Sequence, residues 1–283
     1  MQTSLSLWKT EATLPRLALP SRADCIQQDG AHLPVVIINL DHRVDRWQAV
    51  ARRAAAVGLT NLIRAPAVDG RRLPAEKISA LLCASAEDAE GAPRSHLSLT
   101  RPAIGCFLSH LAVWRWIIEE NVPRVLVLED DACPTEDFSL QRLRQLCNGL
   151  SGEHGLVFAG CIIMDGLAEQ ALGDPLARLY YFNGTFAYLI TPQMCRTLLS
   201  KLFPLRTHID HQISSILFDH RNTIKAYYTN PLFFEPDWTL RSDCYVPITH
   251  QAHADRELAE LFGRHRRRLL FEGRPLLTHY RAA

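Results

Sequence analysis

Short apolar runs alternate with amphipathic stretches along the chain, and this alternation predicts its first elements. Residues 34–40 form a continuous run rich in valine and isoleucine, which predicts a strand buried on both faces. Apolar residues recur at helical spacing over 47–57, and Gly58 stands where a helix commonly ends. A second short strand is predicted over 61–68. Strand, helix and strand in succession form a βαβ unit, which predicts a parallel sheet.

The same alternation continues through the rest of the chain. Thr100 and Pro102 are typical of a helix start, and an apolar stripe carries that helix to about Asn121. Residues 125–128 form another apolar run, which predicts a further buried strand. Three more strands are predicted at 156–160, 185–190 and 224–229, and two more helices at 191–202 and 209–217.

These elements predict one α/β domain at residues 34–250, with a Rossmann-like, mostly parallel sheet flanked by helices. Residues 1–33 lack clear periodicity and are expected to be an N-terminal leader segment. Residues 251–283 are expected to form a basic helical tail, which is either a solvated helix face or a contact with an anionic membrane. The small, polar residues of 84–99 predict a mobile loop that closes over a bound ligand.

Composition excludes several classes of protein. The 283 residues are 47% hydrophobic and carry a formal net charge of +1, which argues against a nucleic-acid partner. No apolar run approaches the roughly 18 residues that span a bilayer, and the N-terminus has no signal-peptide pattern. The eight cysteines are scattered without a Cys-x-x-Cys pair, which favours reduced thiols. We therefore expect a cytoplasmic protein, located either in solution or peripherally at the inner face of the membrane.

Three consecutive acids follow the strand at 125–128, and they are the strongest chemical feature of the chain. Glu129, Asp130 and Asp131 stand where an α/β sheet binds its ligands, at the carboxyl end of a strand. Carboxylates at such a place hold Mg²⁺ or Mn²⁺ against a diphosphate, because hard cations prefer oxygen ligands. The alternative is a solvated turn after the strand.

Polar residues also follow the other two predicted strands of the βαβ unit. Asn39 ends the first strand, and Asp69 with Gly70 ends the second. The carboxyl ends of these strands would lie side by side, where an amide and a carboxylate suit a base edge and a ribose. Asp-Gly is also a common turn, so the turn interpretation stays open.

The helix that starts near Thr100 carries a glycine, a serine and a histidine in its first two turns. Gly105, Ser109 and His110 could face a phosphate there, because free N–H groups and the helix dipole favour anions. The alternative is that Gly105 only permits close packing between helix and sheet and that His110 is an ordinary polar residue.

Taken in order, these motifs resemble those of glycosyltransferase family 25. This family includes bacterial lipooligosaccharide galactosyltransferases and collagen hydroxylysine galactosyltransferases. The matched stretches are residues 35–46, 67–71, 104–110 with Trp114, 127–131, 183–190, 209–211 and Ser242-Asp243. One departure is Ala103, which stands where the family usually has a glutamate.

The resemblance implies a GT-A-type fold and a UDP-sugar donor, usually UDP-galactose. It also implies Mn²⁺ or Mg²⁺ as cofactor and an inverting transfer to a hydroxyl acceptor, for which a glycan such as lipooligosaccharide is expected. The expected nucleotide-sugar residues are Asn39, Leu40, Asp69, Gly70, Gly105, Ser109, His110, Asp130, Asn183, Gly184 and Thr185. The expected metal ligands are Glu129, Asp131 and, from the C-terminal side, His250.

Inverting transfer needs a base that deprotonates the acceptor hydroxyl. Asp210 is the first candidate because it lies at a predicted helix start, and Asp243 is the second. Asp210 could instead serve only the helix dipole. Two rival functions remain: a sugar nucleotidyltransferase, which would normally show a glycine-rich basic loop after the first strand, and a non-catalytic descendant that only binds a nucleotide.

Overall fold

The structure is a computed structural model, and all that follows concerns the residues it describes. These are 14–25, 33–74, 77–78, 81, 100–149, 155–163, 168–169, 175–203, 205–240 and 243–244. Several predictions fall outside the described residues: the loop at 84–99, His250 and the tail at 251–283.

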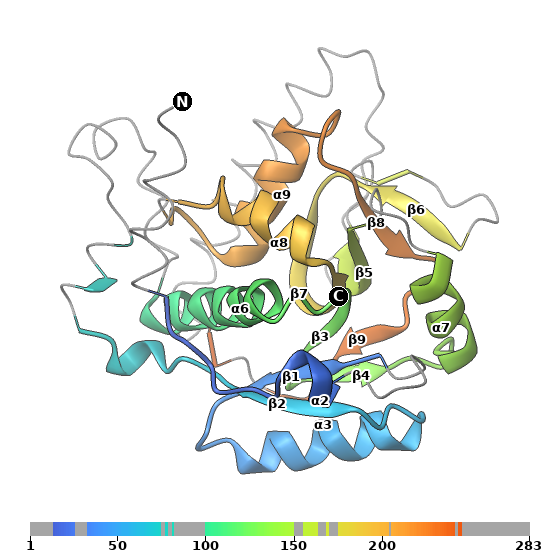
Figure 1. The fold of residues 1–283 in the computed structure, drawn as a ribbon, viewed down its shortest axis with the longest axis horizontal. Helices are drawn as coiled ribbons and strands as arrows, with labels where there is room; N and C mark the ends of the chain where they lie inside the picture. Colours follow the sequence, from blue (N-terminus) through green and yellow to red (C-terminus); the bar gives the residue numbers. More distant parts are fainter. Residues whose placement is uncertain are drawn as a thin grey trace.

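A seven-stranded sheet forms the centre of the described chain (Figure 1). Its order is β2-β1-β3-β7-β5-β8-β6. The strands are β1 (Val35–Asn39), β2 (Leu62–Pro66), β3 (Val125–Glu129), β5 (Leu156–Ile163), β6 (Leu176–Leu179), β7 (Phe182–Ile190) and β8 (Ala226–Thr229). β1, β2 and β3 are mutually parallel, β7 is antiparallel to both β3 and β5, and β8 is parallel to β5. Five strands therefore run one way and only β7 and β6 run the other, which confirms the predicted mostly parallel α/β sheet.

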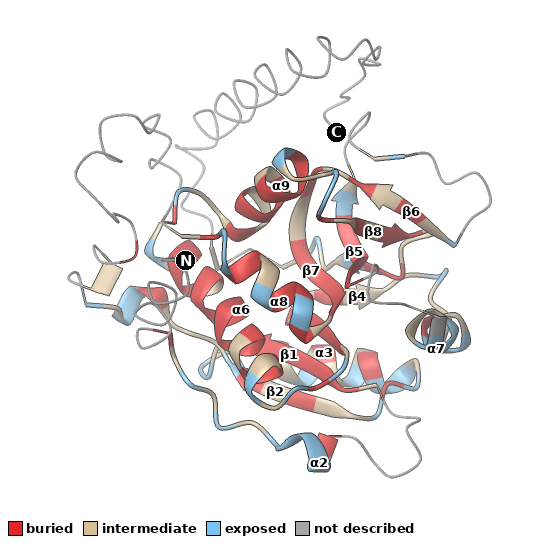
Figure 2. Ribbon diagram, turned by 45° about the horizontal axis from the view of Figure 1, so that its top comes forward, coloured by how far each residue is buried: buried red, intermediate tan, exposed pale blue. Residues whose placement is uncertain are grey.

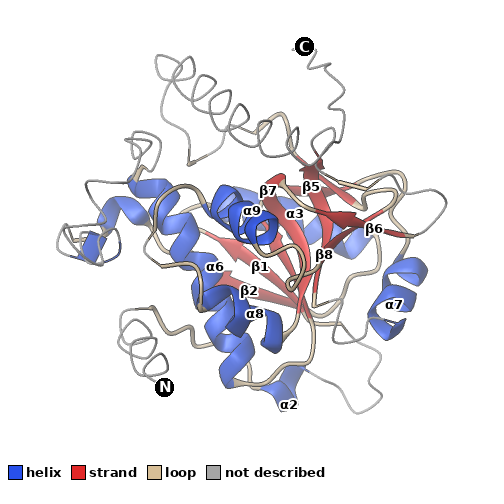
Figure 3. Cartoon of the chain, turned by 90° about the horizontal axis from the view of Figure 1, so that it is seen from above, coloured by secondary structure: helices blue, strands red, loops and turns tan. Residues whose placement is uncertain are grey.

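Helices cover both faces of this sheet, and Figures 2 and 3 show the layers. One face packs against α6 (Arg101–Glu119), α8 (Pro192–Leu199) and α9 (Ile209–Asp219). The other packs against α3 (Val44–Ala56), α7 (Leu140–Gly149) and a small second sheet of β4 (Ala132–Pro134) and β9 (Phe234–Pro236). Two short elements complete the described chain: α2 (Arg22–Cys25) and the 3-10 turn η1 (Gly70–Arg72). None of the helices in the described residues is long and apolar enough to cross a membrane.

β1 shows why the sequence dictates this three-layer arrangement. Val35 and Ile37 belong to the core under α3, while Val36 and Ile38 belong to the core under α6. Because side chains alternate between the faces of a strand, an unbroken apolar run is stable only between two covered faces.

The predicted helix starts and ends are also present. The Thr100 Oγ1 accepts a hydrogen bond from the Ala103 N–H at 3.2 Å, and Pro102 lies in the first turn of α6. Thr191 caps α8 in the same way through the Met194 N–H at 3.3 Å. Gly58 follows α3 with a φ of +84°, a conformation that favours glycine.

Several strand boundaries differ from the predicted ones by two or three residues, and the end of β2 matters for the site. β2 ends at Pro66 rather than at residue 68, so Asp69 does not close the strand. Asp69 instead caps η1, where its Oδ1 accepts from the Arg71 N–H at 3.1 Å. The strand ends there because its partner β1 ends at Asn39. The Ala67 N–H makes the last bond, to the Asn39 carbonyl, and the chain then turns into η1, which packs on α6.

Candidate functional site

A pocket opens over the carboxyl ends of β1 and β3. Its empty volume is about 650 Å³, with the space open to solvent included. The lining residues come from β1 and the turn after it, from α3, from residues 67–71 after β2, from α6, from the acid triplet and from residues 243–244. Of the predicted site residues, those in the pocket wall are Asn39, Leu40, Asp69, Gly70, Ser109, His110, Glu129, Asp130, Asp131 and Asp243.

Asp131 is the least satisfied member of the acid triplet. Its Oδ1 is buried and has no hydrogen-bond partner among the described residues. Burial, followed by the charges of Glu129 and Asp130, raises the pKa of Asp131 to about 7. An ionised carboxylate at this position therefore needs a cation to stabilise it.

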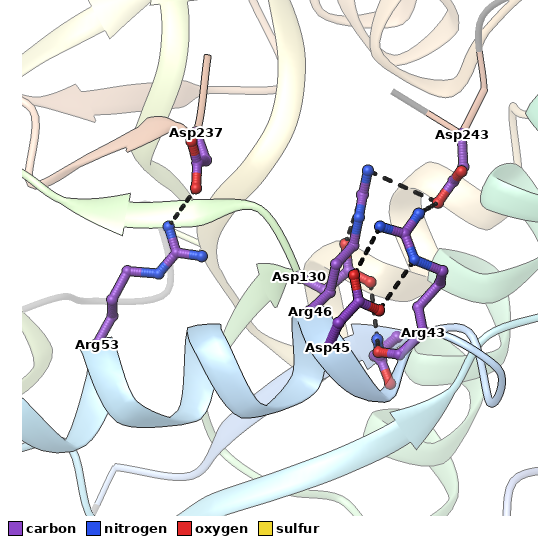
Figure 4. Close-up of polar contacts among 8 residues, drawn as sticks. Arg43, Asp45, Arg46, Arg53, Asp130, Asp237 and Asp243 are labelled. Carbon is purple, nitrogen blue, oxygen red and sulfur yellow. Dashed lines mark hydrogen bonds and ion pairs between the residues drawn. The ribbon is translucent and has the colours of Figure 1, made fainter. Parts of the chain in front are cut away.

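Asp130, in contrast, is fully engaged with the protein. Its Oδ2 accepts from Asn39 Nδ2 at 2.8 Å, and its Oδ1 accepts from Arg46 Nη1 at 3.0 Å. Burial raises its pKa, and the bonds from Asn39 and Arg46 offset part of that rise. Because α3 supplies Arg46 and β1 supplies Asn39, the first βαβ unit holds the middle acid in place (Figure 4).

Asn39 uses its whole amide for this purpose. Its Nδ2 also donates to the Arg43 carbonyl at 3.0 Å, and its Oδ1 accepts from Arg64 Nε at 2.9 Å. Both N–H groups of the Asn39 amide are therefore engaged, and its oxygen can accept one further bond. The structure gives Asn39 the role of positioning Asp130.

Arginines gather around Asp243 at the pocket. Arg43 Nη1 lies 2.5 Å and Arg46 Nη2 lies 3.7 Å from the Asp243 Oδ2 (Figure 4). Arg71 Nη2 donates to the Asp243 carbonyl at 3.4 Å. These three guanidinium groups bring positive charge to the pocket beside the negative acid triplet. Positive charge of this kind suits a diphosphate.

The turn at 67–71 is packed tightly on α6. A Cβ added at Gly105 would lie 2.4 Å from the Val68 carbonyl oxygen and 2.5 Å from the Gly70 nitrogen. Ser109 Oγ accepts from the Val68 N–H at 2.8 Å and donates to the Gly105 carbonyl at 2.7 Å. The structure therefore gives Gly105 and Ser109 a packing role that holds Asp69 at the pocket, and their contact with a nucleotide stays a prediction.

His110 is completely buried and belongs to a network rather than to the helix N-terminus. Its Nδ1 lies 2.8 Å from the Tyr188 hydroxyl, which also accepts from Trp114 Nε1 at 2.9 Å. Its Nε2 lies 3.4 Å from the Glu129 Oε1. Thr185 Oγ1 donates to the same Glu129 oxygen at 2.6 Å. Both tautomers of His110 fit, because a phenol hydroxyl can donate or accept. His110 from α6 and Thr185 from β7 thus hold the Glu129 carboxylate in place.

The remaining predicted residues lie outside the lining of this pocket. Asp210 is buried at the start of α9, where its Oδ2 accepts from the Gly184 N–H at 2.8 Å and its Oδ1 from the His211 N–H at 2.9 Å. Burial alone would raise the pKa of Asp210, but His211 and the Gly184 N–H lower it overall. Gly184 has a φ of +77°, and the Asn183 Oδ1 beside it is buried without a hydrogen-bond partner in the described chain. Asp210 thus joins β7 to α9, and its role as base stays a prediction.

Four residues of the pocket lining were missed from the sequence, Arg46, Arg71, Cys106 and Cys244, and so was Arg43, which is paired with Asp243. Arg43 and Arg46 lie within the first matched motif, but their partners lie 84 to 200 residues away in the chain. No local pattern connects such partners.

The acid triplet fits a divalent cation. Glu129 and Asp131 supply two carboxylates, and one of them has a buried oxygen without a partner. Oxygen ligands of this kind suit Mn²⁺ or Mg²⁺. Asp130 has less need of a cation than Asp131, because Asn39 and Arg46 each donate to one of its two oxygens.

Comparison with known proteins relates the chain to one family. Residues 32–154 match the model of glycosyltransferase family 25, which is described as a family of LPS biosynthesis proteins. The predicted resemblance to glycosyltransferase family 25 is confirmed. A glycosyltransferase 25 family member of Drosophila melanogaster is 26% identical over 77% of this chain and 38% of that protein. Procollagen galactosyltransferase 2 of Homo sapiens is 34% identical over 40% of this chain and 18% of that protein.

A third family 25 relative carries a different name. In Bos taurus, a probable inactive glycosyltransferase 25 family member 3 is 28% identical over 71% of this chain and 36% of that protein. This chain thus spans less than two fifths of the length of each of these three relatives. Among solved structures, an apo UDP-glucose pyrophosphorylase superposes with a TM-score of 0.41 and 11% identity, over 75% of this chain and 93% of that chain. A TM-score this low says nothing about function.

Proposed function

We propose that the chain is a glycosyltransferase that moves a hexose, most simply galactose, from a UDP-sugar to a hydroxyl group of a glycan acceptor. Support comes from the family 25 match and from a galactosyltransferase among the relatives. A cytoplasmic location and a lipooligosaccharide acceptor are parts of the same proposal. Contact of the basic tail with a membrane is not part of it.

The observation that carries the proposal is the buried, unpartnered Oδ1 of Asp131 beside Glu129 in the pocket wall. A carboxylate pair of this kind, beside a group of arginines, matches the charges of a metal-bound diphosphate. Mn²⁺ or Mg²⁺ held by Glu129 and Asp131 would neutralise the charge that develops on the leaving UDP.

The other residues of the pocket have separate tasks in this proposal. Asp69 binds the nucleotide, and Gly70, Gly105 and Ser109 hold it in position through backbone packing. Arg43, Arg46 and Arg71 bind the diphosphate when the donor enters. Each of these arginines would exchange a contact with residue 243 for a phosphate oxygen.

The base must reach the acceptor hydroxyl inside the pocket. Asp243 lines the pocket, whereas Asp210 lies outside its lining. We therefore assign proton removal to Asp243, which must move from Arg43 to the acceptor side of the sugar once the phosphates have taken its place on the arginines. Attack from the side opposite the diphosphate inverts the anomeric centre. Asn183, Gly184 and Thr185 lie outside the pocket lining; we place them on the sugar side, where Thr185 donates to Glu129.

A non-catalytic nucleotide-binding protein is the second candidate, because one relative is named as probably inactive. A panel of UDP-sugars separates the two functions when UDP release is followed with Mn²⁺ and with a chelator. The proposal expects metal-dependent release with one preferred donor, and faster release when a glycan acceptor is added. UDP binding without release from any donor would establish the non-catalytic protein instead.

A further inference from the structure

Cys106 and His110 place a thiol and an imidazole beside the acid triplet. The two residues are four positions apart on α6, so their side chains lie on the same face of the helix. Both line the pocket together with Glu129. A sulfur, a ring nitrogen and a carboxylate oxygen of these three residues all lie within 4.8 Å of one another.

We infer that Cys106, His110 and Glu129 form a binding site for a thiophilic divalent cation of the zinc class, separate in its preference from the Mn²⁺ or Mg²⁺ that a sugar diphosphate requires. A thiolate is a soft ligand that favours zinc, while Mn²⁺ and Mg²⁺ favour oxygen ligands. The inference concerns metal binding alone and does not depend on the proposed transferase activity.

The distances suit tetrahedral coordination. With ordinary zinc bond lengths, a nitrogen and an oxygen ligand of one tetrahedral ion lie about 3.4 Å apart. His110 Nε2 and Glu129 Oε1 are already 3.4 Å apart. A thiolate ligand of the same ion would lie about 3.6 Å from that nitrogen and from that oxygen. The Cys106 sulfur is within 4.8 Å of both, so a change in its side-chain torsion is enough to bring it to this distance.

The surroundings supply further features of a metal site. The Tyr188 hydroxyl can accept the Nδ1–H of His110, which leaves the lone pair of Nε2 directed at Glu129. Such an outer hydrogen bond is usual for a histidine that binds a metal. The thiol of Cys244 is hydrogen-bonded to that of Cys106 and lines the same pocket, so a fourth ligand is at hand. Binding converts the Cys106 thiol to a thiolate, and its proton goes to solvent.

Co²⁺ tests this site directly, because a cobalt–thiolate bond gives a near-ultraviolet charge-transfer band that oxygen ligands do not give. The chelator-treated full chain is titrated with Co²⁺ and then with Zn²⁺. We expect one cobalt per chain, a charge-transfer band, and loss of that band when Zn²⁺ displaces the cobalt. In Cys106→Ser the band should fall by at least half, because at most the thiolate of Cys244 remains as a sulfur ligand, and zinc affinity should fall by more than ~100-fold, the upper range for loss of an outer-shell partner.

Cys147→Ser is the matched control, because Cys147 lies on α7 against the opposite face of the sheet. It should keep the band. No band in the wild type, or a band of equal strength in Cys106→Ser, would overturn the inference. If Cys106→Ser does not fold, alkylation of the wild-type chain decides: Zn²⁺ should protect Cys106 and leave Cys147 reactive, and equal labelling of Cys106 with and without Zn²⁺ overturns the site. A chain that shows the cobalt band but transfers no sugar contradicts only the proposed function.

Discussion

Asp131→Asn should stabilise the metal-free protein at alkaline pH and remove its response to Mn²⁺. Asparagine keeps the shape of the side chain and removes its charge. In the wild type, that charge is buried, has one oxygen without a partner, and stands beside Glu129 and Asp130. The substitution therefore removes a negative charge that destabilises the folded protein when no metal is bound.

The size of the effect follows from the pKa. That of Asp131 is raised from 3.8 to about 7, with burial as the main cause. At about 1.4 kcal/mol per pKa unit, ionising this group in the metal-free fold costs on the order of 4 kcal/mol. Because the pKa is raised by folding, the stability contributed by the neutral carboxyl is complete below about pH 4 and is lost as the pH rises through about 7. The variant should gain about 1.5 kcal/mol over the wild type at pH 5 and about 4 kcal/mol at pH 8.

Urea denaturation at pH 5 and pH 8, in the presence of a chelator, measures this difference. Asp137→Asn is the matched control, since Asp137 is an exposed acid shortly after the triplet. It should shift the free energy of unfolding equally at the two pH values. The argument fails if the wild type is at least as stable as Asp131→Asn at pH 8 without metal.

The same experiment repeated with Mn²⁺ tests the proposed metal site. A cation that binds only the folded state raises its stability, and binding requires the ionised carboxylate. Mn²⁺ should therefore stabilise the wild type more strongly at pH 8 than at pH 5, and should leave Asp131→Asn nearly unchanged. Equal stabilisation of both proteins would place the ion elsewhere.

Four further substitutions test the assigned roles. Asp69→Ala should weaken UDP and UDP-galactose binding alike, by roughly tenfold in calorimetry; a loss seen only with the sugar nucleotide would move Asp69 to another subsite. Gly105→Ala should lower the free energy of unfolding by about 1–3 kcal/mol, because the added Cβ meets backbone atoms; an unchanged denaturation midpoint would contradict this packing. Asp243→Asn should lower turnover roughly 10²-fold or more while UDP affinity stays nearly constant, whereas Asp210→Asn should mainly lower stability, by about 1–3 kcal/mol. The opposite pattern would return the base to Asp210.

The elements could be predicted from the sequence because their determinants are local. The apolar run at β1, the caps at Thr100 and Thr191 and the positive φ at Gly58 each depend on a few neighbouring residues. The pairing of β4 with β9 could not be predicted in this way. Each of these strands has three residues, and Ala132 pairs with Pro236 across more than a hundred positions. Such short strands carry no periodicity of their own.

The residues of the site also differ in whether the sequence alone could reveal them. The acid triplet and Asp69 were found because strand ends are visible in the sequence, and the pocket brings them together. The role of His110 was not found, because its partner Tyr188 lies 78 residues further on. The helix start suggested phosphate binding, but burial against β7 gives His110 the task of holding Glu129.

The long-range contacts also explain how three consecutive acids are tolerated at the end of a buried strand. Each acid is compensated by a different part of the fold: Glu129 by Thr185 and His110 from β7 and α6, and Asp130 by Asn39 and Arg46 from β1 and α3. Of the three acids, only Asp131 keeps a buried oxygen without a partner in the part of the chain that the structure describes. If the triplet were merely a solvated turn, water would satisfy all three carboxylates and none would require arginine or histidine partners. Because the three acids are compensated unequally, one carboxylate is left for a bound cation to neutralise. It lies at the carboxyl end of β3, where an α/β sheet binds its ligands.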